Sequence, residues 1–268
     1  MAKLDTPFLF TGSLGNVSAY TMRGTDKIIL RTKGGATKQM IKTAPQFEMT
    51  RLINAEFGGR AKAGSLLLQS ISPMKALADH NLSGPVNALL KPVQAMDTEH
   101  GLGQRSILFS RGAHMLSGYN LNRQYPFDGI VRTPVTYGMD AVHRSASLEI
   151  PEMLPGINFH VPGRYAYFGL IVVLGMVPDL HHGPAGYAPA GERNSWPPPV
   201  IFYSAWYPVS KGSPGLSVLL EQTPPPDNGY GLVLSIGIRF GAPGDGGNIE
   251  QVKWAGSARL LLGKGSVG

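Results

Sequence analysis

Hydrophobic positions in the first 35 residues of this chain fall into short runs separated by turn-forming residues. Apolar residues gather at 8–11, 17–20 and 27–31, and the intervening segments 12–16 and 23–26 contain Gly, Asn and Asp. Such spacing is typical of β-hairpins, and a third strand is expected because an isolated hairpin is only marginally stable in water. The pattern predicts a small N-terminal β-hairpin unit, or arm, over residues 1–35.

A helical period replaces this pattern after Gly35. Thr43 or Ala44, followed by Pro45, suits a helix start. Apolar or small residues then recur at steps of three and four, which predicts one buried helix face made of Ile53, Phe57, Ala61, Gly64, Leu68 and Ile71. Pro73 and the cluster 83–85 interrupt the period, so we expect a short helical segment of two or three helices over residues 36–102.

From Gly103 onward the chain has the character of β structure. Apolar or alternating runs separated by Pro- and Gly-rich segments occur at 105–109, 169–177, 200–209, 216–220, 232–240 and 251–262. Strands without intervening helices favour an antiparallel β-sandwich or jelly-roll-like domain over residues 103–268. The sequence therefore predicts an α+β fold, with a long surface, interface or binding loop at 179–199.

Composition narrows the classes of protein that remain. The chain of 268 residues has no Cys, which excludes disulfides, thiolate zinc sites and Cys nucleophiles. The longest apolar run, 168–177, is too short to span a bilayer. The first residues lack a signal-peptide core, which predicts cytoplasmic synthesis and leaves extracellular release after lysis, or by a non-classical route, open.

Positive charge is concentrated near the N-terminus. The net charge is +7, and residues 1–64 hold ten Lys and Arg against four Asp and Glu. A basic segment of this kind suits nucleic acid, an acidic membrane surface or the acidic face of a neighbouring subunit, and it also suits a plain solvated face. The phosphate-binding residues that the nucleic-acid reading predicts are Arg31, Lys33, Lys38, Lys42, Arg60 and Lys62, with Arg23 and Lys27 beside them.

Motifs for catalysis are weak. His181 and His182, beside Asp179, are the best metal candidate, but no further ligand stands at a suitable spacing, and structural histidines are commoner. There is no G-x-S-x-G nucleophile turn, and the Gly-rich segments 34–38 and 101–103 lack the spacing of phosphate-binding loops. We predict a protein that is not an enzyme and that has no cofactor and no resident metal.

Two further groups of residues have both a chemical and a structural interpretation. Glu149 and Glu152 flank Pro151, and a cleft that brought them together would have the two carboxylates of a glycosidase, although a solvated loop is the commoner context. Aromatic residues that suit a carbohydrate platform, or more often a core or subunit interface, are Tyr165, Tyr167, Trp196, Tyr203, Trp206 and Tyr207. Of these we place Trp196, Tyr203 and Trp206 in an assembly interface.

The glycines at 58–64 are the least ordinary feature of the predicted helix. Glycine inside a helix costs about 1 kcal/mol relative to Ala, so three within this stretch need compensation. Close approach of another helix is the favoured source, contact with a phosphate is the second, and a break in the helix at 58–59 is the third. The same small residues are the predicted assembly interface on this helix: Gly58, Gly59, Ala61, Ala63 and Gly64.

These segments also carry a family resemblance. The motifs are GSLGN at 12–16, RTKGG at 31–35, P-x-FE-x-TR at 45–51 and EFGG-x-AKAG at 56–64, with weaker similarity at 104–120 and in VKWAG at 252–256. With these motifs the chain resembles an uncharacterised bacterial protein family of similar length, which implies a shared fold and no known activity.

The function predicted from all these features is a structural subunit that self-assembles, as a homo-oligomer or polymer, into a filament, tube or shell. The alternatives are a nucleic-acid-associated, phage-like coat protein with a basic N-terminal face and a carbohydrate-binding β-sandwich.

Overall fold

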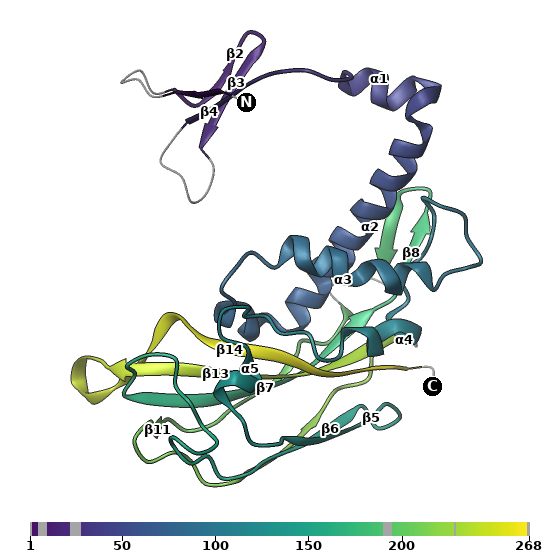
Figure 1. The fold of residues 1–268 in the computed structure, drawn as a ribbon. Helices are drawn as coiled ribbons and strands as arrows, with labels where there is room; N and C mark the ends of the chain where they lie inside the picture. Colours follow the sequence, from purple (N-terminus) through teal and green to yellow (C-terminus); the bar gives the residue numbers. More distant parts are fainter. Residues whose placement is uncertain (1, 5–9, 22–27, 190–194, 228, 267–268) are drawn as a thin grey trace. The chain divides into compact units, whose positions relative to one another are not determined.

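The computed structural model describes residues 2–4, 10–21, 28–189, 195–227 and 229–266. The chain divides into two compact units, Met1–Arg51 and Leu52–Gly268, and each is described by itself. Figure 1 labels the elements. Residues 8–9 of the first predicted strand, together with Arg23 and Lys27, lie outside the described residues.

The first unit contains a four-stranded antiparallel sheet of short strands in the order β1-β4-β3-β2. The strands are β1 (Ala2–Leu4), β2 (Gly12–Leu14), β3 (Val17–Thr21) and β4 (Ile28–Thr32). The predicted strands at 17–20 and 27–31 correspond to β3 and β4. The predicted turn is tighter than expected, because β2 extends to Leu14 and Gly15 turns the chain with a φ of 52°.

Two short helical turns follow the sheet: α1 (Lys38–Thr43) and η1 (Pro45–Phe47). Thr37 caps α1, since its hydroxyl oxygen accepts a hydrogen bond from the Met40 N–H at 3.2 Å. Arg51 Nη1 donates to the carbonyl oxygens of Ile41 and Ala44 at 3.0 and 2.9 Å. These bonds satisfy carbonyl groups at the end of α1 and fix its position relative to the start of the next helix.

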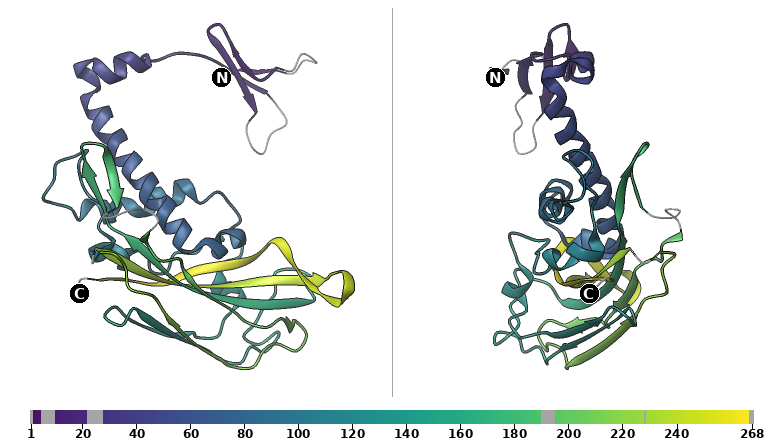
Figure 2. Two further views of the ribbon diagram at one scale, coloured as in Figure 1. Left: turned by 180° about the vertical axis from the view of Figure 1, so that it is seen from behind. Right: turned by 90° about the vertical axis from the view of Figure 1, so that its right-hand side faces the viewer.

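The second unit is built on a sandwich of two antiparallel sheets, which Figure 2 shows as layers. The main sheet has the order β10-β7-β13-β14, with β11 also pairing with β7; its strands are β7 (Tyr167–Pro178), β10 (Val200–Tyr203), β11 (Tyr207–Pro208), β13 (Tyr230–Pro243) and β14 (Ile249–Gly265). The second sheet has the order β12-β6-β5; its strands are β5 (Thr136–Asp140), β6 (Ser145–Ile150) and β12 (Leu216–Glu221). The predicted α+β fold with a larger antiparallel β domain is confirmed.

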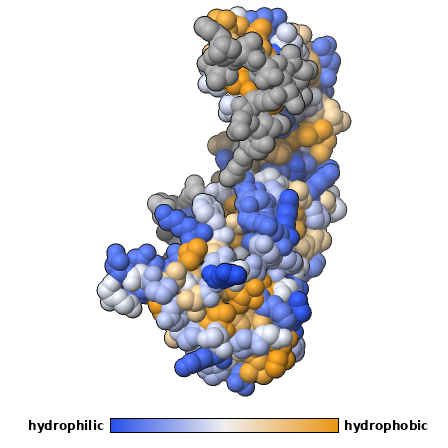
Figure 3. All heavy atoms as spheres, turned by 60° about the vertical axis from the view of Figure 1, so that its left-hand side comes forward, coloured by the Kyte–Doolittle hydropathy of each residue, from blue (hydrophilic) through white to orange (hydrophobic). Residues whose placement is uncertain are grey.

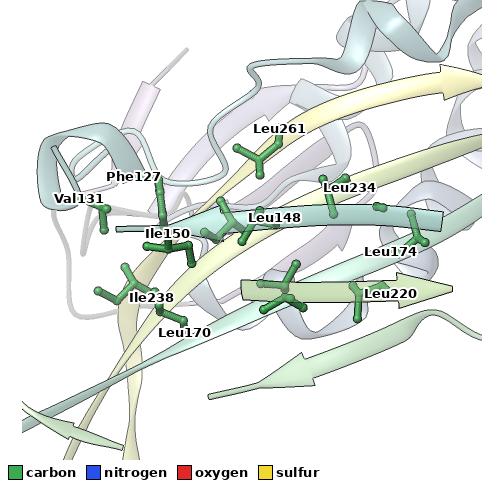
Figure 4. Close-up of a cluster of buried hydrophobic side chains, with 14 of the residues drawn as sticks. Phe127, Val131, Leu148, Ile150, Leu170, Leu174, Leu220, Leu234, Ile238 and Leu261 are labelled. Carbon is green, nitrogen blue, oxygen red and sulfur yellow. The ribbon is translucent and has the colours of Figure 1, made fainter. Parts of the chain in front are cut away.

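One hydrophobic core lies between the two sheets (Figure 4). Alternate residues of β12, Val218 and Leu220, are buried there, whereas their neighbours Ser217, Leu219 and Glu221 are exposed. Because side chains alternate across a strand, this period places one face of the second sheet in the core and the other on the outside. Other members of the core include Leu148, Ile150, Leu170, Leu174, Leu234 and Ile238.

Helices cover part of the opposite face of the main sheet. They are α2 (Glu48–Ser70), η2 (Ser72–Leu77), α3 (Ser83–Ala95), α4 (Phe109–Gly112) and η3 (Ala113–Leu116). Their buried residues, among them Leu67, Met74 and Leu90, share a second core with Val173 and Val233 of the sheet. Within the second unit, the helices of the predicted segment 36–102 therefore pack on the β domain in a common core.

The remaining elements are α5 (Phe127–Ile130), η5 (Asp245–Gly247) and a two-stranded sheet of β8 (Leu180–Gly183) and β9 (Gly186–Pro189). The strand expected at 105–109 is wrong: only Ile107 pairs, in an isolated bridge with Leu180, and Phe109 begins α4. Strands β5 and β6 are absent from the sequence prediction. In the described part of the chain, no helix has the length and apolar character needed to cross a membrane.

Candidate functional site

Helix α2 buries a charged and polar face instead of the apolar face that the sequence predicts. Its buried residues are Glu56, Gly59, Arg60, Ala63, Gly64, Leu67 and Ser70. By contrast, Ile53 and Phe57 are 50% and 55% exposed. The predicted face is therefore wrong in its first half, because polar partners from other elements make burial of Glu56 and Arg60 possible. The helix is continuous and does not break at 58–59.

The Arg60 guanidinium is the centre of this buried network. Its Nε donates to Asn87 Oδ1 at 3.1 Å and its Nη1 to Gln94 Oε1 at 2.5 Å, both on α3. Nη1 also lies 3.7 Å from Glu56 Oε2. Arg105 approaches the same carboxylate, with 3.4 Å between Nε and Oε1. Each charge is thus paired and hydrogen-bonded, as burial requires.

Tyr187 of β9 extends the network to the β8–β9 hairpin. Its hydroxyl donates to the Arg105 carbonyl oxygen at 2.9 Å and accepts from Gln94 Nε2 at 3.1 Å. The Tyr187 ring covers Gly59, where an added Cβ would lie 2.7 Å from two ring atoms. Gly64 likewise faces α3, and its Cβ would lie 3.1 Å from Val86 Cγ1. Close packing therefore compensates for two of the three glycines: another helix approaches Gly64, as favoured, and a tyrosine ring of a strand approaches Gly59, whereas an added Cβ on Gly58 would meet no atom within 4 Å.

This packing corrects several predicted site residues. Gly59, Ala63 and Gly64 are buried against the chain's own residues, so they are not available as an assembly interface. Arg60 is used inside the network, and Lys62 Nζ donates to the Tyr187 carbonyl oxygen at 3.0 Å, so neither is a free phosphate ligand. The EFGG-x-AKAG motif is a packing motif that joins α2 to α3 and β9.

The rest of the predicted residues on these elements remain on the surface. Gly58 and Ala61 are exposed on α2, where Phe57, Ala61 and Leu68 line a groove of about 570 Å³ together with residues 80–84. In the first unit the cations Arg31, Lys33, Lys38 and Lys42 are exposed.

Asp97 ties the end of α3 to the segment that leads into Arg105. Its Oδ2 accepts from the Ser106 N–H at 2.6 Å and from His100 Nδ1 at 2.8 Å, and its Oδ1 accepts from the N–H groups of Glu99 and His100. Burial by itself raises the pKa of Asp97, but these hydrogen bonds outweigh it and lower the pKa to about 2.

Replacing Asp97 with Asn is expected to destabilise the fold by about 2 kcal/mol at neutral pH, since several charge-assisted hydrogen bonds are weakened. The pKa is lowered from 3.8 in folding, so the stabilisation by the carboxylate is fully present above that value and is lost as the pH falls toward 2. Urea unfolding of both chains at several pH values measures the difference in their free energies of unfolding. A difference that stays constant on acidification would show that the Asp97 carboxylate is not its source.

The strongest candidate site is a cluster that we call the aromatic–arginine platform, defined as Tyr203, Trp206 and Arg239. The Arg239 guanidinium carbon lies 4.1 Å from the centre of the Trp206 ring and 4.9 Å from that of Tyr203. Cation–π contacts of this kind hold an arginine side chain in one position. Tyr203 is 49% exposed, so the platform reaches the surface.

Two glycines of the main sheet form the base of the platform. A Cβ on Gly169 would lie 3.1 Å from Arg239 Nε and 3.4 Å from Trp206 Cε3. A Cβ on Gly241 would lie 3.0 Å from Trp206 Cζ3. Side chains at these two positions would displace the arginine and the indole, so the glycines let both groups lie close against the sheet.

The charge of Arg239 is not neutralised within the described part of the chain. None of the ion pairs there involves it, and its one hydrogen bond runs from Nη2 to the Ser204 carbonyl oxygen at 3.4 Å. Its Nε is buried without a partner. Burial lowers the pKa of Arg239. A planar guanidinium with unused N–H donors suits a carboxylate or another anion.

The other aromatic candidates do not join this platform. Tyr165 stacks on Phe240 with 4.5 Å between ring centres, and Tyr207 packs near Phe168, so both contribute to the inter-sheet core. Trp196 lines a separate groove of about 450 Å³ beside Ser70 and residues 197–199. The six aromatics therefore do not form one continuous surface.

The candidates for metal binding and catalysis are also separated. Asp179 is buried and accepts hydrogen bonds from the Ser110 N–H and hydroxyl, at 2.8 and 2.5 Å, while His181 and His182 are exposed on β8. Burial raises the pKa of Asp179. No group of three or more metal-ligating side chains occurs among residues that the structure describes. Glu149 and Glu152 are both exposed, at β6 and just after it.

Comparisons of the chain with protein-family models, with curated proteins and with solved structures find no match.

Proposed function

We propose that this protein is a structural subunit that assembles with copies of itself. The observation that carries the proposal is the small number of buried apolar side chains described in the first unit. Among residues 10–21 and 28–51, whose burial the structure describes, these are Ala19, Ile28 and Ile29, and α1 buries none. Units of this size need a disulfide, a metal or a second polypeptide when their own core is small. The chain has no Cys for a disulfide.

The sheet of the first unit also has a strand edge that suits pairing. β2 is an edge strand, all three of its residues are exposed, and Leu14 is 70% exposed. An exposed edge of this kind can receive a strand of a neighbouring chain, with the backbone hydrogen bonds supplying affinity. We therefore place one intersubunit contact at β2.

Exposed apolar residues of the second unit favour the same function. Figure 3 shows hydrophobic side chains gathered among charged ones on the surface of the sandwich. Those that are at least half exposed in this unit are Ile53, Phe57, Val142, Ile157, Leu219 and Trp254. Contact with another copy would remove such side chains from water, which is the favourable term in most protein association.

The test compares the full chain with a chain lacking residues 1–35, by negative-stain electron microscopy and light scattering. The full chain is expected to form regular filaments, tubes or shells, and the shortened chain to remain much smaller because the strand-pairing edge is gone. A full chain that stays at the monomer mass of 28.6 kDa would overturn the proposal. Normal assembly of the shortened chain would overturn the role of β2.

The same preparations address the nucleic-acid alternative. Arg31, Lys33, Lys38 and Lys42 are exposed, and no Asp or Glu occurs between residues 27 and 47. A coat protein that uses these cations would retain nucleic acid at low salt and release it as salt rises. Assemblies whose ultraviolet absorbance is that of protein alone, at low salt, would exclude this version.

A further inference from the structure

The aromatic–arginine platform lies on the outer face of the main sheet. Ile238 and Phe240 of β13 are buried between the sheets, so Arg239 between them points to the other side. In the neighbouring row the same outer face is covered by η2, where an added Cβ on Gly237 would lie 2.6 Å from Leu77 Cδ1. At Arg239 the rings of Trp206 and Tyr203 lie beside the guanidinium.

The second sheet presents an acidic outer face, which we define as Glu149, Leu219 and Glu221. Val218 and Leu220 of β12 and Leu148 and Ile150 of β6 enter the core, so these three residues point away from it. The register pairs Ser217 with Glu149 and Leu219 with Ser147, which places Leu219 in the row between the two carboxylates. Leu219 is 66% exposed.

The two surfaces are complementary in chemistry. The platform offers an unneutralised guanidinium flanked by aromatic rings, and the acidic outer face offers carboxylates flanking an exposed leucine. Arginine binds carboxylates in a planar, two-bond geometry, and aromatic residues with arginine are the usual centres of protein interfaces.

The local charge favours a single carboxylate over a polyanion. Residues 134–268 contain eight Lys and Arg against nine Asp and Glu. A nucleic-acid surface would require a continuous excess of positive charge around the aromatic residues. The sandwich does not supply that excess, whereas one guanidinium suffices for one Asp or Glu side chain.

The two surfaces lie on opposite outer sides of the sandwich. A contact that joins the platform of one copy to the acidic outer face of the next is heterologous and leaves the other surface of each copy free. Contacts of this kind build rings or open helical polymers.

We propose that the aromatic–arginine platform of one copy binds the acidic outer face of a second copy, with Arg239 pairing to Glu149 or Glu221 and Leu219 lying against Trp206 and Tyr203. The inference rests on the proposed self-assembly and assigns one of its contacts.

Charge reversal tests the contact. Arg239→Glu places like charges opposite each other, and so does Glu149→Arg or Glu221→Arg. Each variant alone is expected to need a concentration about tenfold higher or more for assembly. An equal mixture of Arg239→Glu chains with the matching Glu→Arg chains is expected to assemble as an alternating polymer, because every platform then meets a face of opposite charge.

Arg132→Glu is the control, since Arg132 is exposed and belongs to neither sheet; it should assemble like the natural chain. Circular dichroism melting confirms that each variant is folded, and Arg239→Lys supplies a variant that keeps the charge but loses the planar pairing. The contact is overturned if folded Arg239→Glu chains assemble normally, or if neither mixture restores assembly. Those results leave the proposed function standing, whereas a natural chain that stays monomeric removes both.

Discussion

Replacing Arg60 with Ala is expected to lower the free energy of unfolding by about 3 kcal/mol or more. The substitution leaves Glu56, which is 7% exposed, without its neighbour on α2 and removes the donor to Asn87 and Gln94. Breaking a buried pair by removing one partner is costly because the remaining charge stays buried. Urea unfolding, followed by circular dichroism, measures the loss.

Two further variants show where the loss comes from. Lys62→Ala changes a cation on the same helix that makes a single bond to the Tyr187 carbonyl oxygen, and it should cost only about 1 kcal/mol. Arg60→Met keeps much of the side-chain volume without the charge, so it separates packing from electrostatics. Equal losses for Arg60→Ala and Lys62→Ala would show that the network contributes little.

The second large effect is that Ala substitutions at two adjacent glycines are expected to change the stability of the protein in opposite directions. Gly58→Ala is expected to stabilise the protein by about 0.5–1 kcal/mol, because a Cβ there meets no atom within 4 Å and Ala is the better helix former. Gly59→Ala is expected to destabilise by about 1–3 kcal/mol, because its Cβ would lie 2.7 Å from the Tyr187 ring. That ring is held by hydrogen bonds to Gln94 and Arg105.

Thermal unfolding of the two single variants measures the difference directly. Adding Tyr187→Leu to Gly59→Ala tests whether the tyrosine ring causes the destabilisation, since it removes the ring against which the new methyl group packs. Destabilisation by Gly59→Ala should then become smaller. Equal effects of Gly58→Ala and Gly59→Ala would contradict the close approach of α2 to β9.

The strands of the main sheet were predictable from sequence because their signal is local. Runs such as 169–177 and 232–240 are apolar on both faces, since one face meets the second sheet and the other meets helices. β5 and β6 give a weaker signal, because Thr136–Asp140 contains only two apolar residues in five and β6 alternates apolar residues with Ser and Glu over only six positions. At 105–109 the error is the opposite one, because a strand is predicted where the structure has none. A short apolar run suits a helix as well as a strand.

The buried face of α2 could not be read from its own residues. Counting apolar positions selected Ile53 and Phe57, which are exposed, over Glu56 and Arg60, which are buried. The partners that make this burial possible, Asn87 and Gln94, lie 27 and 34 residues further along the chain. A helix period reports hydrophobicity, and it does not report polar pairs that form only in the tertiary structure.

The sequence identified two of the three residues of the platform. Tyr203 and Trp206 are among the residues that the sequence predicts for an assembly interface, but Arg239 is not, because it lies inside the apolar run 232–240. An isolated cation in the middle of a predicted buried strand is the signal that would have found it. Such a residue must either reach solvent or find a partner, and in this sheet it lies against two aromatic rings.

The irregular course of β14 limits how the sandwich itself can grow. β14 is an edge strand of the main sheet, and between Gln251 and Gly256 four residues stand opposite the single residue Phe240. At the tip of this bulge Trp254 has a φ of 61° and is 77% exposed. Further along, residues 118–121 hydrogen-bond to Ala258 and Leu260 and occupy the outer side of the strand. A long edge interrupted and covered in this way resists lateral pairing with another sheet. This edge of the main sheet is thereby protected from amyloid-like pairing with strands of another chain.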